Sequence, residues 1–266
     1  MRATSNNPAL TRIPAFAGAN KTVGFGPGPQ TTDPLEAGYF GPTATSRDTG
    51  RMTVEDVTVR TAIMLATLVA TGGLTWYLNL EFLALPAVLI GLVLGLVISF
   101  KQITNPAVIL SYAAVEGVFL GGISKLFETA YNGIVVQAII GTLGVAAVML
   151  ALYRSGKIRV TPQFTKMVIG ATLGYFLLLM VNLVAGFFTD GGLGLFDGGL
   201  LSIGICAFAI GLASLNLVLD FDFIQKGADA GMPERYGWLA AFGLVVTLVW
   251  LYIEILRLLS YLRGDN

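Results

Sequence analysis

Four acidic side chains lie inside or at the ends of long apolar stretches, and their chemistry needs explaining. Asp220 and Asp222 occur in the segment LNLVLDFDFIQKG, Glu116 in SYAAVEGVFLGG and Glu254 in VWLYIEILRLL. An ionised carboxylate at the centre of a bilayer costs about 2.5 to 3.5 kcal/mol on insertion scales, so such a group is kept when it is paired, protonated or facing water. Uptake and release of protons is therefore the chemistry expected of these residues.

The elements that carry these acids are predicted to be membrane-spanning helices. The chain has 266 residues, of which 55% are hydrophobic and 12% charged, whereas soluble domains carry about 25% charged residues. About 20 apolar residues in a helix cross the hydrocarbon core. We predict an all-α integral membrane protein, a bundle of seven transmembrane helices in residues 51–266, preceded by a disordered cytoplasmic tail rich in Gly, Pro and Thr in residues 1–50. The apolar blocks run roughly over 57–78, 82–100, 107–127, 134–153, 167–188, 200–219 and 238–262.

The composition argues against several classes of protein. Formal net charge is zero, so no attraction to nucleic acid is implied. The chain has no histidine and one cysteine, Cys206, which argues against a zinc site or a disulfide framework. No apolar core follows Met1, so no signal peptide is expected. No phosphate loop, metal cluster or nucleophile–base arrangement is evident, and we expect neither enzymatic activity nor a cofactor.

The basic residues predict an orientation, because they favour the cytoplasmic side of a membrane. Seven spans place the N-terminal tail and the second, fourth and sixth loops on one side. We therefore expect a multi-pass protein of the plasma membrane, with the N-terminus in the cytoplasm and the C-terminus outside. The basic residues on the predicted inner side are Arg47, Arg51, Lys101, Arg154, Lys157, Arg159, Lys166, Lys226 and Arg235, and the outer side has Lys125 and Arg263.

The two aspartates near the end of the sixth span should point in different directions. Residues two apart on a helix are separated by about 200°. Asn216 lies four residues before Asp220 and so shares its face. We assign Asn216 and Asp220 to the bundle interior, and Asp222 to the inner rim, where Lys226 lies one turn away.

Glu116 and Glu254 are expected near the middle of their spans. Each has a structural interpretation: Glu116 as a protonated, hydrogen-bonded glutamate, and Glu254 as the partner of Arg257, three residues later on the same face, with Arg257 reaching outward. The alternative is that both glutamates face the interior and hold protons.

Three glycine pairs have the spacing that allows close helix packing in lipid. They are Gly91 and Gly95, Gly117 and Gly121, and Gly170 and Gly174. We interpret these pairs as sites of tight packing in a dense bundle.

The chain resembles the Bax inhibitor-1-like membrane proteins, their actinobacterial branch most closely, from about residue 36 to the C-terminus. The segments that carry the resemblance are EAGYFGPTATSRDTGRMTVEDV, NPAVILSYAAVEGVFLGGIS, GIVVQAIIGTLG, IRVTPQFTK, LNLVLDFDFI and FGLVVTLVWLYIEILRLLSYLR. The resemblance implies a pH-sensitive calcium leak, in which acids on the last two helices share a proton and gate a pore. By position, Asp220 matches the acid of the sixth helix and Glu254 that of the seventh.

The spacing argues against direct contact between these two acids. Asp220 and Glu254 are 34 residues apart in the sequence, and counting from a turn near Gly231 places them at depths that differ by roughly 18 Å if both helices are regular. Either a break in a helix restores the pair, or Glu254 pairs with Glu116. We favour a Glu116–Glu254 cluster, with Asp220 as a separate inner gate.

The function expected from these residues is a cation leak gated by protonation of Asp220, Glu254 and Glu116, with Asn216, Asp222 and Arg257 in support. The resemblance implies calcium as the permeant ion, and oxygen ligands suit calcium. The three gating acids are its candidate transient contacts. The alternative is a non-conducting regulator that binds membrane proteases or quality-control partners, in which the tail would be essential. A proton-coupled transporter predicts inverted repeats, and no repeat is visible. The expected surroundings are the lipid bilayer and membrane-protein partners, and no oligomeric state is implied.

Overall fold

The computed structural model describes residues 50–189, 192–195 and 197–264. Seven helical segments in this part of the chain are long and apolar enough to cross a membrane, as the sequence predicted. The tail predicted for residues 1–50 lies, except for Gly50, outside the described residues. In chain order the elements are α4 (Val54–Tyr77), the 3-10 turn η1 (Glu81–Leu83), α5 (Ala84–Lys101), α6 (Pro106–Ala130), α7 (Ile134–Arg154), α8 (Pro162–Ala185), α9 (Leu200–Asp229) and α10 (Tyr236–Gly264).

Local capping signals set where several helices begin. The Thr53 hydroxyl accepts a hydrogen bond from the Asp56 amide at 3.1 Å, and the Asp56 carboxylate accepts one from the Thr53 amide at 3.1 Å. This capping box starts α4 at Val54, three residues before the predicted block of 57–78. In α8, the Thr161 cap precedes Pro162 in the first turn. Because proline is well suited to that position, α8 starts five residues before the predicted block of 167–188.

Helix α9 extends ten residues beyond the predicted block of 200–219. Two side-chain pairs one turn apart support the extension: Lys226 Nζ lies 2.7 Å from Asp222 Oδ2, and Gln225 donates to Asp229 at 2.9 Å. Such pairs stabilise a helix where it leaves the hydrocarbon. The prediction ended too early because the apolar run, on which it relied, stops before the helix does.

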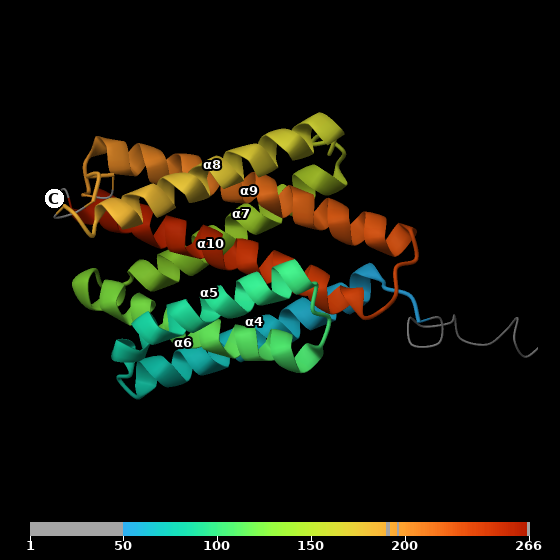
Figure 1. The fold of residues 1–266 in the computed structure, drawn as a ribbon, viewed down its shortest axis with the longest axis horizontal. Helices are drawn as coiled ribbons and strands as arrows, with labels where there is room; N and C mark the ends of the chain where they lie inside the picture. Colours follow the sequence, from blue (N-terminus) through green and yellow to red (C-terminus); the bar gives the residue numbers. More distant parts are fainter. Residues whose placement is uncertain (1–49, 190–191, 196, 265–266) are drawn as a thin grey trace, which may run out of the picture. The chain divides into compact units, whose positions relative to one another are not determined.

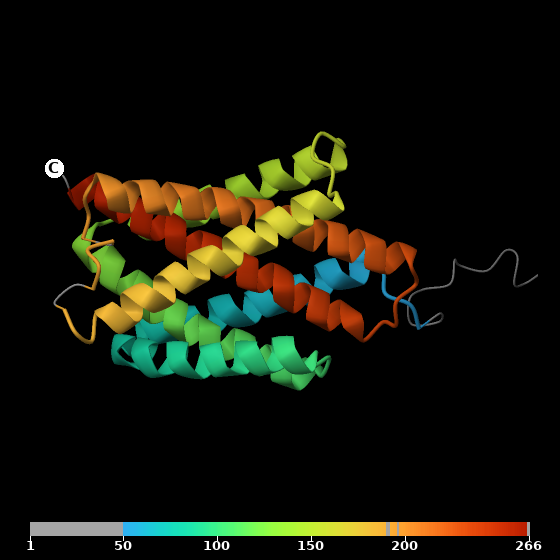
Figure 2. The same cartoon turned by 45° about the horizontal axis from the view of Figure 1, so that its top comes forward.

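Helix α10 is the central element of the bundle (Figures 1 and 2). It packs against α4, α6, α7 and α9, whereas α8 rests mainly on α9. Within the most apolar stretch of each helix, 61% of residues are buried in α10 and 11% in α8. Because the chain passes along the bundle seven times, α4 begins at one end and α10 finishes at the opposite end. We call the end where α4 begins the N-side and the end where α10 finishes the C-side.

The predicted glycine contacts form at two of the three pairs. Gly91 and Gly95 of α5 lie against Glu116 and Tyr112 of α6. A Cβ added to Gly121 of α6 would lie 2.7 Å from the Cα of Gly72 in α4, and Gly117 is equally tight against α4. Here the backbones touch, as the spacing predicted. At Gly170 and Gly174 of α8 an added Cβ would meet no atom within 4 Å. For that pair the prediction was wrong, because α8 packs too loosely for its small residues to meet a neighbour.

The segment before α4 is joined to the loop between α9 and α10 on the N-side. The Met52 amide donates to the Met232 carbonyl at 2.7 Å, and the Glu234 amide to the Gly50 carbonyl at 2.9 Å. Arg60 of α4 binds the Glu234 carboxylate at 2.6 Å and also donates to its carbonyl oxygen. The start of the first span is thus tied to the hairpin that carries Asp220 and Glu254.

Candidate proton-sensing and ion site

Asp220 lies on α9 at a cavity of about 520 Å³ that is formed by the N-side ends of α8 and α9. Its Oδ1 faces α10, 3.7 Å from the position that a Cβ on Gly243 would take. Its Oδ2 is buried and has no hydrogen-bond partner within the described structure. Asn216 lines the same cavity and donates to the Thr172 hydroxyl of α8 at 2.8 Å. The predicted face of Asn216 and Asp220 is therefore present and borders a hollow.

Asp222 lies nearer the mouth of this N-side cavity. Its ion pair with Lys226 is the one expected at the rim, and Lys226 is 65% exposed, compared with 16% for Asp222. Asp220 and Asp222 both line the cavity, although they leave α9 in different directions. The cavity has room for both because it extends along α9 as far as Lys226.

Glu116 is buried between α6 and α5, away from α9. A Cβ added to Gly91 of α5 would lie 2.8 Å from Glu116 Oε2, so the glycine makes room for the carboxylate. Tyr112 lies one turn earlier on α6, and its ring meets that of Phe242 in α10 edge-on at a centroid distance of 4.9 Å. This arrangement fits the structural interpretation of Glu116.

Glu254 is the most enclosed of the four acids, with 1% of its surface exposed. Its Oε1 accepts hydrogen bonds from the Tyr175 hydroxyl of α8 at 2.7 Å and from the Trp250 indole at 3.3 Å. Its Oε2 lies 3.6 Å from Arg257 Nη1, which is the pair expected from the sequence, and has no hydrogen-bond partner within the described residues. The buried thiol of Cys206 in α9 completes the surroundings.

The structure does not bring Glu116 and Glu254 together, so the favoured cluster was wrong. Ser124 of α6 and Tyr252 of α10 share a hydrogen bond of 2.6 Å and so lie at one level. Glu116 precedes Ser124 by eight residues and Glu254 follows Tyr252 by two. With both helices running the same way, the two carboxylates differ in depth by about 15 Å.

Asp220 and Glu254 are also apart, as the spacing predicted. Asp220 faces Gly243, which lies eleven residues before Glu254 on α10, a separation of about 16 Å along the axis. Neither α9 nor α10 is broken, so the helix break that would have restored this pair is absent. The hairpin carries two separate acidic positions, one in each half of the bundle.

Two partners of Glu254 were not identified from the sequence. Trp250 lies one turn before Glu254, so the helical period could have revealed it. Tyr175 could not have been found in that way, since it comes from α8, 79 residues away. Its ring stacks on Trp250 at a centroid distance of 5.7 Å.

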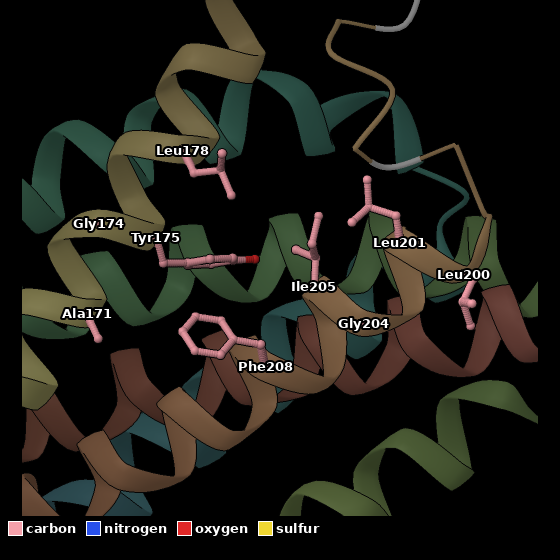
Figure 3. Close-up of a pocket in the computed structure, with 9 residues that line it drawn as sticks. All are labelled: Ala171, Gly174, Tyr175, Leu178, Leu200, Leu201, Gly204, Ile205 and Phe208. Carbon is pink, nitrogen blue, oxygen red and sulfur yellow. The ribbon is translucent and has the colours of Figure 1, made fainter.

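Tyr175 also lines a crevice of about 820 Å³ between α8 and α9 (Figure 3). The other lining residues are apolar, and Gly174 and Gly204 leave its sides open. The crevice is where the loose packing of α8 is most evident. Tyr175 borders the crevice but is only 5% exposed, and its hydroxyl donates to Glu254.

Within the described residues, no group of three or more Asp, Glu, Cys or His side chains is arranged to hold a metal ion. Calcium usually takes six to eight oxygen ligands. Neither Asp220 nor Glu254 belongs to a group of this kind among the described residues.

The profile of the family described as Bax inhibitor 1 like matches residues 7–264. The chain belongs to the Bax inhibitor 1 like family. A search among curated proteins returned no match. Membership, together with the seven apolar helices, identifies a multi-pass membrane protein of this family.

Proposed function

We propose that this Bax inhibitor 1 like protein is a non-enzymatic, proton-regulated cation leak, with calcium as its expected permeant ion. The observation that supports it best is that Asp220 lines the N-side cavity and has a carboxylate oxygen that is buried and without a hydrogen-bond partner among the described residues. An unpaired ionisable group in a span is kept for function more often than for stability.

The chemistry follows from what a proton changes at Asp220. In the ionised form, the carboxylate brings a negative charge to the contact between α9 and α10, close to Gly243 and Thr247, and attracts a cation from the cavity. In the neutral form the attraction is lost and the two helices can pack more closely. The proton and the cation therefore compete for one position, and this competition makes the leak depend on pH.

Glu254 is the second regulated position in this proposal. Tyr175, Trp250 and Arg257 hold its carboxylate in one orientation, and a proton there would weaken the ion pair with Arg257. Because Asp220 and Glu254 lie in opposite halves of the bundle, we propose two gates in series in place of one shared proton. Glu116 is left out of the gate, since it faces α5.

The distribution of basic residues supports an orientation with the N-side in the cytoplasm of a plasma-membrane protein. Helix ends and loops of the N-side carry many more basic residues than those of the C-side, the bias that marks the cytoplasmic side. Described N-side residues of this kind are Arg51, Lys101, Arg154, Lys157, Arg159, Lys166, Lys226 and Arg235, and those of the C-side are Lys125 and Arg263.

Calcium flux into liposomes tests the proposal. Purified protein should admit calcium faster than protein-free liposomes, with a rate that changes between pH 6 and pH 8. Equal flux with and without the protein at every pH would refute a leak.

The contacts made by the residues before α4 favour a second candidate function, that of a non-conducting regulator of membrane-protein partners. Gly50 and Met52 bond to the α9–α10 loop, so a partner that pulled on the preceding residues would act on the hairpin. Removing residues 1–49 should abolish a regulatory effect of this kind while leaving the folded bundle intact. The same truncation should leave the calcium leak in liposomes unchanged.

A further inference from the structure

A second cavity, of about 730 Å³, opens on the C-side and reaches Arg257. It is bordered by the end of α6, the segment before α9 and the last turns of α10. Besides Arg257, the polar side chains that line it are Tyr131, Asp197, Ser260 and Tyr261. Asp197 is exposed, whereas the side chain of Arg257 is 25% exposed. The innermost charge of this cavity is therefore positive.

Arg257 lies between the C-side cavity and Glu254. Its Nη1 is 3.6 Å from Glu254 Oε2, while Glu254 itself does not line the cavity and is 1% exposed. Tyr175 of α8 and Cys206 of α9 close the remaining sides of the carboxylate. Of the charged residues that line the C-side cavity, Arg257 is the one that contacts Glu254.

The two cavities differ in the charge of their linings: Arg257 and Asp197 balance in the C-side cavity, and Arg257 is the less exposed of the two. The N-side cavity is lined by Asp220 and Asp222 with Lys226 as the one cation among its lining residues. Arginine stays charged at any physiological pH, and a fixed positive charge in a narrow opening is a barrier to cations. A proton can still reach Glu254 by exchange through hydroxyl groups and water, because it need not travel as a separate ion.

We propose that Arg257 is the residue that determines ion selectivity at the C-side opening: it repels metal cations, so that Glu254 exchanges protons with that side while calcium is held back. This inference rests on the proposed leak and adds the residue that limits it. The Arg257 guanidinium, which is held by its ion pair with Glu254, makes the passage of calcium slow.

The charge of the opening can be measured without any ion flux. Ser260 lines the cavity, and its hydroxyl donates to the Arg257 carbonyl at 2.7 Å. In a Cys206→Ala background, Ser260→Cys introduces a single thiol there. An anionic thiosulfonate should modify this thiol faster than a cationic one. Arg257→Gln should reduce the ratio of the two rates by about tenfold, since a unit charge acts strongly at a partly buried site.

Arg263→Gln is the matched control for this experiment. Arg263 lies on the same helix at the same end, but it binds the Asn132 carbonyl at 2.8 Å and Gln137 at 2.9 Å. Its replacement should leave the rate ratio close to that of the parent. A ratio that Arg257→Gln does not change, or that Arg263→Gln changes equally, overturns the proposal.

Flux provides a second measurement that does not need the thiol. Calcium entry should rise about tenfold in Arg257→Gln, and Arg257→Lys, which keeps the charge, should remain near wild type. Unchanged flux in Arg257→Gln, alongside a clear wild-type leak, would overturn the role of Arg257 and leave the leak itself standing. If the wild type carries no calcium while the thiosulfonate ratio responds as expected, the proposed leak is refuted, and the proposal that Arg257 sets the charge of the opening is supported.

Discussion

The hydrogen bond from Tyr175 to Glu254 should contribute measurably to stability, and its strength should reveal the charge of the carboxylate. Hydrogen bonds between membrane helices average about 0.6 kcal/mol and reach about 1.7 kcal/mol, while bonds to a charged group in proteins give about 1.5 to 3 kcal/mol. The 2.7 Å bond is made by a carboxylate that is 1% exposed and lies 3.6 Å from Arg257. We therefore expect Tyr175→Phe and Glu254→Gln to be coupled by about 1.5 kcal/mol at pH 8.

A double-mutant cycle of Tyr175→Phe and Glu254→Gln, followed by reversible unfolding in mixed micelles, measures this coupling. Tyr77→Phe is the control for loss of a hydroxyl, because Tyr77 is 79% exposed, and it should change the free energy of unfolding by less than about 0.5 kcal/mol. The glutamine amide oxygen can still accept from Tyr175, so the coupling energy reports the charge of the carboxylate. A value indistinguishable from zero would indicate a neutral carboxyl and refute the ion pair that we infer.

Three further outcomes are expected. Gly121→Ala should destabilise the bundle by about 1 to 3 kcal/mol through overpacking, whereas Gly174→Ala should stabilise it by up to about 1 kcal/mol, because only Gly121 meets a backbone. Thermal unfolding of the two variants measures the difference. Equal effects would contradict the packing described. Arg60→Met should destabilise the folded bundle by about 1 kcal/mol and expose the α9–α10 loop to protease, since Arg60 binds Glu234 in that loop. Unchanged proteolysis would contradict the stabilising role of this ion pair. Glu116→Gln should leave the pH dependence of calcium flux as in the wild type, and loss of that dependence would return Glu116 to the gate.

The sequence was sufficient where the determining interactions are local. Apolar runs of about 20 residues located all seven spans. Helical periodicity correctly joined Asn216 to the face of Asp220, and Arg257 to Glu254. Each of these two pairings joins residues within one turn of each other, so the period of the helix is enough to find it.

The errors concern how helices rotate and pack against one another. The sequence placed Glu116 and Glu254 near the middle of their spans, but the position along a span does not show which helix a side chain faces. Glu116 faces Gly91 of α5. The contact of Tyr175 with Glu254 joins residues 79 apart in the chain. The glycine spacing in α8 resembled that in α6, yet only the tertiary arrangement determines which pair meets a partner.

Calcium flux through Asp220→Asn tests the central claim most directly, with Asp222→Asn as its matched control on the same helix. Asparagine keeps the size of aspartate and cannot titrate. Flux through Asp220→Asn should lose most of its difference between pH 6 and pH 8, with Glu254 as the remaining titrating gate, while Asp222→Asn should keep the wild-type dependence on pH. If Asp220→Asn still responds to pH as the wild type does, protonation of Asp220 does not regulate the leak.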